Sequence, residues 1–318
     1  MHCDIFNGDA DGIFSLHIYR LENPDSGSRL ITGVKRDIRL LSGLDGEQVR
    51  SLAVFDISLD SNRTALRELL QAGCRIDYFD HHFAGEIPAS PRLRARIDTS
   101  AETCTALIVN AEFGGRHPLW AICGAYGDNL HIPAEALAKA QGLSPEQTRR
   151  LQELGELFNY NGYGETVADL HFPPDRLYRG LQGLTSPFDY LEQADEPAVL
   201  REGYREDLNR ALQVPAEPVT GRSRLYLLPG EAWARRVAGV FANLKAQERP
   251  EAAHAIATEN GDGSLRVSVR APLADRRDAD RLCRAYPSGG GRAAAAGINA
   301  LPAEQLSGFI DHFNALYP

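Results

Sequence analysis

Several features are scarce in this sequence, and each scarcity narrows the class of protein. The chain of 318 residues has one methionine, two tryptophans and five cysteines. The cysteines lack Cys-x-x-Cys spacing and are odd in number, so we expect buried, reduced thiols rather than a disulfide framework. No apolar run is long enough to span a bilayer, and no basic-then-apolar leader precedes the first strand. These absences predict a cytoplasmic protein without a membrane partner.

Positive charge is also in short supply. The sequence has 34 Lys and Arg residues against 43 Asp and Glu residues, for a net charge of −9. This charge is unfavourable for a protein that coats long duplex nucleic acid through the phosphate backbone. A small anionic substrate is compatible with it, because such a substrate needs only a local cluster of positive charge, part of which bound metal ions can supply.

An acidic turn stands almost at the N-terminus. Gly8-Asp9-Ala10-Asp11-Gly12 follows a short apolar strand at residues 3–6 and opens a segment with helical apolar spacing at 12–21. In an open α/β sheet, such a turn lies at the carboxyl end of a strand, where ligands bind. Two carboxylates held close together repel unless they are protonated or bridged, and a hard divalent metal is a common bridge. The turn alone fits a solvated Asp-Gly turn equally well.

Acidic and imidazole side chains also stand at the ends of three later elements. These are Asp56 within the apolar run 52–58, Asp80-His81-His82 after the strand 75–79, and Asp128 after the helix 119–126. The apolar runs are typical of central parallel strands, whose carboxyl ends meet at one edge of the sheet. We therefore expect these side chains to gather near Asp9 and Asp11.

The adjacent histidines predict two separate roles. Neighbouring residues in an extended chain point to opposite sides, so His81 and His82 should not easily reach the same point. Neutral imidazole is a good ligand for Mn, Fe or Zn, and Asp80 can hold one ring in its binding tautomer. A histidine pair in a polar loop also occurs without function, so this pair gains its weight from the acids expected beside it.

The later part of the chain predicts a second domain. Residues 133–213 have a helical pattern, the segment Pro215–Pro218 is a candidate boundary, and a new strand begins at Arg224. We predict an α/β chain with an N-terminal parallel-sheet domain at 1–190, a helical linker at 191–218 and a smaller C-terminal α/β domain at 219–318.

Basic and glycine-rich residues concentrate in this second domain. Alternation along the strand 265–270 places Arg266, Ser268 and Arg270 on one face. The run Gly289-Gly290-Gly291-Arg292 precedes an alanine-rich stretch, and its N–H groups suit wrapping an anion while Arg292 forks onto a phosphate. Glycine triplets also occur in flexible linkers, so this motif is weak by itself.

Taken in order, these motifs resemble those of the DHH-family phosphoesterases, RecJ-like or nanoRNase-like, that carry a DHH-associated C-terminal domain. The matching motifs are Gly8-Asp9-Ala10-Asp11-Gly12, Asp56, Asp80-His81-His82, Gly127-Asp128 and Gly289-Gly290-Gly291-Arg292 running to Gly297. Each motif alone is weak, but five in the family's order over nearly the whole length are specific. Two residues depart from the pattern. Asn7 stands where RecJ-like exonucleases have aspartate, and Arg292 stands where many relatives have histidine.

The resemblance implies roles for individual residues. Two divalent metal ions, most often manganese in this family, would be held by Asp9, Asp11, Asp56, His81 and Asp128, with Asp56 bridging them. Asp80 would complete the catalytic set, and His82 would face the substrate phosphate. The second domain would close over the substrate, with Arg270, the glycine run and Arg292 gripping a terminal phosphate or nucleotide.

The function implied by the resemblance is metal-dependent hydrolysis of short single-stranded oligonucleotides or linear dinucleotides. Other family members are phosphatases of small nucleotides such as 3′-phosphoadenosine 5′-phosphate, or cyclic-dinucleotide phosphodiesterases, and the sequence does not separate these activities. The glycine-rich motif counts against an inorganic pyrophosphatase, whose second domain differs. A non-catalytic nucleotide sensor is a further alternative, with Asn7 as its only support. The sequence leaves the oligomeric state open.

Overall fold

The computed structural model describes residues 1–217 and 221–318. The chain divides into two compact units, unit 1 at Met1–Arg201 and unit 2 at Glu202–Pro318. The division falls inside a helix, α9 (Glu196–Leu212). The end of the predicted linker and the first residues of the predicted C-terminal domain, residues 218–220, lie outside the described residues. The assignment of domains to 1–190, 191–218 and 219–318 stays a prediction.

Unit 1 is built on a five-stranded parallel sheet with the order β2-β1-β3-β4-β5. The strands are β1 (His2–Phe6), β2 (Arg29–Ile31), β3 (Ser51–Phe55), β4 (Arg75–Asp80) and β5 (Leu93–Ile97). The central strands β1 and β3 are almost wholly buried, which agrees with their continuous apolar runs and confirms the predicted parallel sheet. Because all strands run the same way, Phe6, Phe55 and Asp80 end at one edge.

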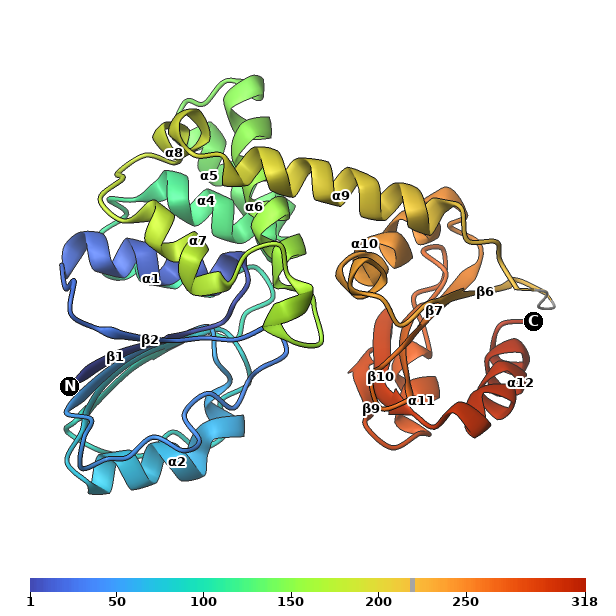
Figure 1. Ribbon diagram of the computed structural model, residues 1–318, viewed down its shortest axis with the longest axis horizontal. Helices are drawn as coiled ribbons and strands as arrows, with labels where there is room; N and C mark the ends of the chain where they lie inside the picture. The colour runs from blue at the N-terminus through green and yellow to red at the C-terminus, as the bar shows by residue number, and fades with distance from the viewer. Residues whose placement is uncertain (218–220) are drawn as a thin grey trace. The chain divides into compact units, whose positions relative to one another are not determined.

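Helices cover both faces of this sheet (Figure 1). α2 (Leu59–Gln71) lies on one face and α1 (Ala10–Glu22) on the other, and Ser58 caps α2 by accepting the Ser61 N–H. The other helices of unit 1 pack on the α1 side, directly or through one another. They are α3 (Thr105–Glu112), α4 (Pro118–Gly127), α5 (His131–Ala140), α6 (Pro145–Gly162), the 3₁₀ turn η1 (Val167–Asp169), α7 (Pro174–Leu181) and α8 (Pro187–Gln193).

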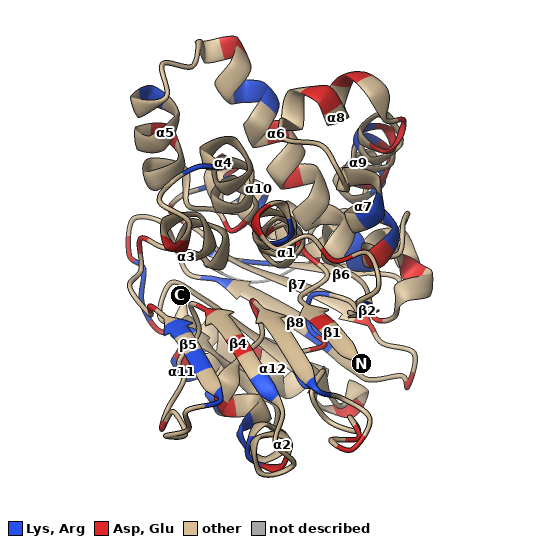
Figure 2. Cartoon of the chain, turned by 90° about the vertical axis from the view of Figure 1, so that its left-hand side faces the viewer, with Lys and Arg blue, Asp and Glu red and all other residues tan. Residues whose placement is uncertain are grey.

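The outer strand β5 carries basic residues, which are blue in Figure 2. Arg94 pairs with Asp77 at 2.8 Å, and Arg96 pairs with Glu112 at 2.8 Å. Charged side chains on an edge strand discourage pairing with another chain. These arginines therefore stabilise and protect the sheet, and they lie on a different strand from the predicted site residues.

Unit 2 contains a second five-stranded sheet with the order β6-β7-β8-β10-β9. β6 and β7 are parallel, and the other pairs are antiparallel. Its elements are β6 (Ser223–Leu228), α10 (Ala232–Glu248), β7 (Ala253–Glu259), β8 (Leu265–Arg270), α11 (Ala279–Arg284), β9 (Gly289–Arg292), β10 (Ala295–Leu301), the 3₁₀ turn η2 (Ala303–Gln305) and α12 (Leu306–Leu316). Val267 and Val269 enter the core under α11 and α12, whereas Tyr226 and Ile256 pack against α10 on the opposite face. The predicted alternation along β8 is confirmed.

Two predicted elements differ in the structure. The strand expected at 52–58 ends at Phe55, because Asp56 turns away with a φ of 56°. The glycine run, expected as an anion-wrapping loop, is the edge strand β9 paired with β10. A Cβ on Gly289 would lie 1.8 Å from the Cys283 carbonyl oxygen, so close packing against α11 requires glycine there.

The structure also tests two expectations drawn from composition. All five cysteines are free and buried, as predicted. In the parts of the chain that the structure describes, no helix combines the length and the apolar character needed to cross a membrane.

Candidate metal centre

Asp56 lies at the centre of a cluster at the carboxyl edge of the first sheet. It is 3% exposed, and its positive φ of 56° is unfavourable for a residue other than glycine. Its Oδ1 lies 3.4 Å from His81 Nε2 and 3.8 Å from His82 Nδ1. One ligand atom from each of the three residues lies within 4.8 Å of the others, an arrangement that can hold a metal ion.

The two histidine rings lie together rather than apart. β4 ends at Asp80, so the alternation of an extended strand does not continue into the pair, and the ring centroids are only 4.4 Å apart. The expectation that His81 and His82 reach different points is wrong for this reason. Asp80 Oδ1 orients both residues, because it accepts the His81 backbone N–H at 2.9 Å and lies 2.7 Å from His82 Nδ1.

Asp128 joins the cluster from the end of α4. Its Oδ2 lies 3.7 Å from His81 Nε2, and its Oδ1 lies 3.9 Å from Lys35 Nζ. Burial raises the pKa of Asp128 to about 6, since the lowering by Lys35 is outweighed by burial together with the nearby Asp11 charge. Carboxylate and imidazole side chains therefore converge from β3, β4 and α4.

Asp9 is buried but already has partners within the chain. It caps α1 by accepting the Gly12 N–H at 3.1 Å, and its Oδ2 accepts a hydrogen bond from Lys35 Nζ at 2.5 Å. Burial raises the pKa of Asp9, but the charge and hydrogen bond of Lys35 lower it by more, so the pKa lies below its usual value. The carboxylate is thus held in its charged form by Lys35.

Asp11 is likewise engaged by the backbone. Its two oxygens accept the N–H groups of Thr105 at 2.8 Å and Ala106 at 2.7 Å, the first residues of α3. The N–H groups at the start of a helix have no partner inside the helix, and a carboxylate can accept their hydrogen bonds. The positive end of the helix dipole also stabilises the negative charge of that carboxylate. Asp11 therefore anchors α3 beside the sheet in addition to any ligand role.

The electrostatics of the cluster fit a divalent cation. Burial and the charges of Asp11 and Asp9 raise the pKa of Asp56 well above its usual range. Burial lowers the pKa of His81, but the hydrogen bond with Asp56 and the charges of Asp11 and Asp56 raise it to about 10. Asn7 Oδ1 and Asp80 Oδ2 are two of several buried side-chain atoms that lack a hydrogen-bond partner in the part of the chain that the structure describes. Closely spaced carboxylate and imidazole groups offer the oxygen and nitrogen ligands that an ion such as Mn²⁺ binds, and the positive charge of the ion would offset the repulsion between the carboxylates.

Two residues of this cluster were not predicted from the sequence. Lys35 follows the short strand β2, and its position in a basic pair after an apolar strand was the only available signal. Thr105 Oγ1 donates to Asp56 Oδ1 at 3.2 Å while its N–H binds Asp11. No sequence pattern marks Thr105, because its place depends on how α3 packs.

The predicted substrate-binding arginines of unit 2 share one face of the second sheet. Arg270 stands opposite Ala295, and Ala295 stands opposite Arg292, so the three residues form one row across β8, β10 and β9. The next row on the same face is Ser268, Gly297 and Gly290. The two arginines therefore lie on either side of Ala295, next to a row of small residues. Alternation places Gly289 and Gly291 on the opposite face of the sheet. Arg270 Nε also donates a hydrogen bond to Asn243 Oδ1 at 2.7 Å.

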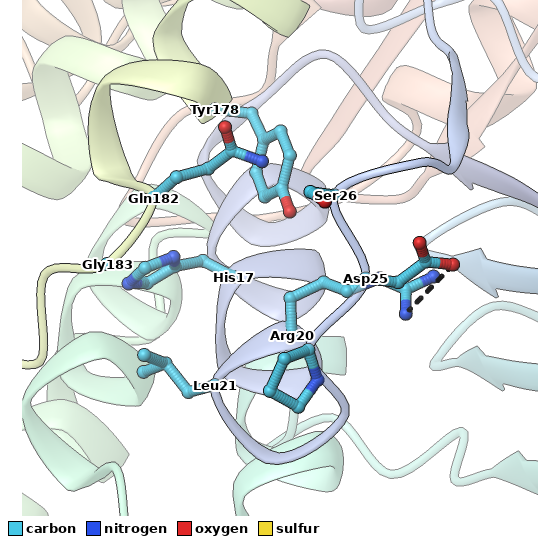
Figure 3. Close-up of a pocket in the computed structure, with 9 residues that line it drawn as sticks. His17, Arg20, Leu21, Asp25, Ser26, Tyr178, Gln182 and Gly183 are labelled. Carbon is cyan, nitrogen blue, oxygen red and sulfur yellow. Dashed lines mark ion pairs between the residues drawn. The ribbon is translucent and has the colours of Figure 1, made fainter.

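Unit 1 also contains a cavity of about 340 Å³, whose lining residues are drawn in Figure 3. It is lined by His17, Arg20, Leu21, Pro24, Asp25, Ser26, Tyr178, Gln182 and Gly183. These residues come from the last turns of α1, the following loop and the end of α7, and they include none of the predicted site residues. Arg20 is already paired with Asp4 through Nε at 2.9 Å and Nη2 at 2.5 Å. The cavity therefore includes none of the carboxylates and histidines of the candidate metal centre.

Comparisons with known proteins find similarity in structure alone. No family model matches the sequence, and no curated protein matches it. The exonuclease RecJ bound to manganese gives a TM-score of 0.61 at 17% identity, covering 99% of this chain and 89% of RecJ. A DHH domain described as a member of the s1p family of ribosomal proteins gives 0.62 at 13% identity, covering 99% and 86%. The pGpG-specific phosphodiesterase PggH from Vibrio cholerae gives 0.50 at 14% identity, covering 99% of both chains. The chain therefore has the RecJ-like DHH fold that its motifs predict.

Proposed function

We propose that this protein is a divalent-metal-dependent phosphoesterase that hydrolyses short single-stranded oligonucleotides or linear dinucleotides. The observation that carries the proposal is the convergence of Asp56, His81 and Asp128 at the carboxyl edge of a sheet with the RecJ fold, with His82 beside them. Ligand atoms of Asp56, His81 and His82 lie within 4.8 Å of one another, and Asp128 Oδ2 lies 3.7 Å from His81 Nε2. The match to PggH covers 99% of the PggH chain, and PggH is described as a pGpG-specific phosphodiesterase. This match supports a short substrate. The net charge of −9 also disfavours long duplexes. A cytoplasmic location stays a prediction from composition.

The proposed cofactor is Mn²⁺, with the count of two ions that the resemblance implies. Asp56, His81 and Asp128 would hold one ion, Asp9 and Asp11 would contribute to the other, and Asp56 would serve both. Bound divalent ions make water a better nucleophile and stabilise charge on the transferring phosphoryl group. Asp80 Oδ1 accepts a hydrogen bond from His82 Nδ1–H at 2.7 Å. In the neutral ring, Nε2 of this half-exposed side chain then carries the lone pair and can accept a proton, and the protonated ring can donate a hydrogen bond from Nε2 to the substrate.

Arg270 and Arg292 would bind the anionic part of the substrate. A guanidinium forms two parallel hydrogen bonds with phosphate oxygens, which an ammonium does not. Neighbouring strands lie about 4.8 Å apart, so two residues separated by one strand start roughly 10 Å apart. Long side chains at that spacing can converge on one phosphate above Ala295, where the small side chains leave room for a nucleotide.

A substrate panel tests the proposal directly. We would incubate the protein with Mn²⁺ and linear dinucleotides, longer oligonucleotides, cyclic dinucleotides and 3′-phosphoadenosine 5′-phosphate, and separate the products by chromatography. We expect linear dinucleotides to be cleaved fastest and chelator to abolish the reaction. Fastest cleavage of a cyclic dinucleotide or of the bisphosphate would favour those alternatives. Tight nucleotide binding without turnover in any divalent metal would favour the sensor.

The role of Arg292 can be measured by a double-mutant cycle with the substrate. A charge-assisted hydrogen bond is worth roughly 1.5–3 kcal/mol, so Arg292→Ala should lower kcat/KM by about 10- to 100-fold for a dinucleotide with a terminal phosphate. The loss should be much smaller when that phosphate is removed. Arg277→Ala is the matched control, since Arg277 is exposed and paired with Asp275, and it should change kcat/KM less than about twofold. Strictly additive losses would mean that Arg292 does not contact that phosphate.

A further inference from the structure

Lys35 enters the acidic cluster from the segment after β2, and several groups hold it there. Its backbone N–H donates to the Gly162 carbonyl at 2.9 Å. Its Nζ donates to Asp9 Oδ2 at 2.5 Å and to Asn159 Oδ1 at 2.8 Å, and it lies 5.5 Å from the centre of the Tyr163 ring. A carboxylate, an amide oxygen and an aromatic face are all favourable neighbours for an ammonium group. The Lys35 ammonium therefore sits in a built cation site.

The position of α6 explains why this place suits a cation. Asn159 and Gly162 belong to the last turn of α6, and the C-terminal end of a helix carries partial negative charge. The side chain of Asp9 is only 3% exposed and that of Lys35 is 27% exposed. Separating such an enclosed pair is costly unless another cation takes the vacated place. Asp9 is therefore not free to bind a second cation while the ammonium stays.

The acids around Asp56 lie farther from the ammonium, because Lys35 Nζ is 3.9 Å from Asp128 Oδ1 but 2.5 Å from Asp9 Oδ2. Asp56 Oδ1 lies 3.4 Å from His81 Nε2, and Asp128 Oδ2 lies 3.7 Å from the same atom. Beside Asp9, Asn7 is neutral, and its amide donates to the Lys35 carbonyl at 3.1 Å. The Asp9 position thus has a bound ammonium and a neutral neighbour, and both features lower its attraction for a divalent ion.

We propose that the Lys35 ammonium occupies the cation position beside Asp9, so that a divalent ion binds there only by displacing it, whereas an ion held by Asp56, His81 and Asp128 does not require the ammonium to leave Asp9. The inference rests on the proposed metal-dependent function. It makes the two ion positions unequal: the ion at Asp56 is resident, and the ion at Asp9 is exchangeable. Lys35 is a positioning residue that sets the affinity of the second ion.

Metal titration of matched variants tests this inference without measuring turnover. Isothermal titration calorimetry with Mn²⁺, checked by elemental analysis, should find one tight ion in the native protein and a second that binds at least about tenfold more weakly. Lys35→Met should tighten the second ion by about 10- to 100-fold and change the first by less than about threefold. Arg36→Met removes the same charge from the next residue, whose guanidinium is 4.0 Å from Glu165, and should change neither. Lys35→Arg, which keeps the charge, should preserve the native difference.

The outcomes separate this inference from the proposed function. Two ions of unchanged affinity in Lys35→Met would overturn the role of Lys35 and leave the metal-dependent function intact. A native protein that binds no divalent ion would overturn the function itself. If Lys35→Met is too unstable to titrate, thermal melting decides, because freeing Asp9 should make Mn²⁺ raise the Tm of the variant more than that of the native protein. Equal increases in Tm would also overturn the inference.

Discussion

The acidic cluster has two sides that use the same residue type differently. Asp9 and Asp11, which we call the Asp9 side, accept four hydrogen bonds from the chain at 2.5–3.1 Å. Asp56, His81, His82 and Asp128, which we call the Asp56 side, face one another at 3.4–3.8 Å. The first side is saturated by backbone and lysine donors. The second is held together by the fold with weaker mutual contacts, which leaves its ligand atoms available to an ion.

The difference shows that a buried acid near a site can be structural, functional or both. Asp11 supplies the cap of α3, and Asp9 supplies the cap of α1. Removing a helix cap typically costs about 1 kcal/mol, and more when the lost partner is charged and buried. By contrast, the raised pKa of Asp56, caused by burial and by the Asp11 and Asp9 charges, means that its ionised form destabilises the metal-free fold. The Asp9 side supports folding, whereas the ionised Asp56 carboxylate is unfavourable unless positive charge lies beside it.

The largest expected effect is the loss of activity in Asp56→Asn. The variant keeps the shape of the side chain but removes the charge that would serve both ions. We expect kcat to fall by about 10³-fold or more, which corresponds to roughly 4 kcal/mol of transition-state stabilisation. The metal-free Tm should stay equal or rise, because an unfavourable buried charge is removed. Steady-state kinetics in Mn²⁺ and thermal melting measure both; near-native turnover would refute the bridging role.

Asp11→Ala is the counterpart on the Asp9 side, and it should act first on stability. It leaves the N–H groups of Thr105 and Ala106 without their partner at a buried helix start. We expect a loss of about 2–4 kcal/mol in the free energy of unfolding, measured with urea. Asp60→Ala, at an exposed position in the first turn of α2, should cost less than about 1 kcal/mol. A stable Asp11→Ala variant would contradict the difference between the two sides.

The next prediction separates the two histidines within the Asp56 side. His81 contacts both Asp56 and Asp128, whereas His82 contacts Asp80 and its side chain is 44% exposed. His81→Ala should therefore weaken Mn²⁺ binding by about 100-fold. His82→Ala should change Mn²⁺ affinity less than about threefold and lower kcat by about 10- to 100-fold. Metal analysis of both variants decides between ligand and substrate roles, and equal metal loss would make both histidines ligands.

The pH dependence of metal binding should also belong to the Asp56 side. The pKa of His81 is raised to about 10 and that of Asp128 to about 6, so the metal-free protein carries a proton on His81 at pH 7. Metal ligands must be deprotonated, so binding releases that proton and strengthens as pH rises. We expect Mn²⁺ affinity to increase by about tenfold per pH unit between pH 6 and 8. Calorimetry in two buffers of different ionisation enthalpy should detect about one released proton, and a pH-independent affinity would contradict this assignment.

The sequence predicted the parts of this arrangement that depend on local pattern. Apolar runs identified β1, β3 and β4, because strands buried on both faces of a parallel sheet need continuous apolar side chains. From those strands it followed that Asp56 and His81 should meet at one edge. The end of β3 was missed because Asp56 adopts a left-handed conformation, which residue type alone does not reveal.

Contacts between distant segments were beyond the reach of local pattern. Asp11 and Thr105 are 94 residues apart, and their hydrogen bond depends on the packing of α3. The row of Arg270, Ala295 and Arg292 depends on strand register, which the sequence does not specify for a glycine-rich strand. The glycine run suits a loop and a strand equally, and only packing against Cys283 decides between them.

The smallest expected effect concerns Thr105, which touches both sides of the cluster. Its N–H donates to Asp11, and its Oγ1 donates to Asp56 at 3.2 Å. Thr105→Val removes only the second contact, because the backbone donor and the branched shape remain. One neutral donor to a carboxylate is worth about 1 kcal/mol, so kcat should fall by about three- to tenfold while the free energy of unfolding changes by less than about 1 kcal/mol.

Thr105→Ser keeps the hydroxyl and serves as the control, with near-native kcat expected. If Thr105→Val instead lost stability and kept its kcat, the Thr105 hydroxyl would serve folding, and Asp56 would be as saturated by the chain as Asp11. The contrast between the two sides therefore depends on this contact affecting turnover more than stability.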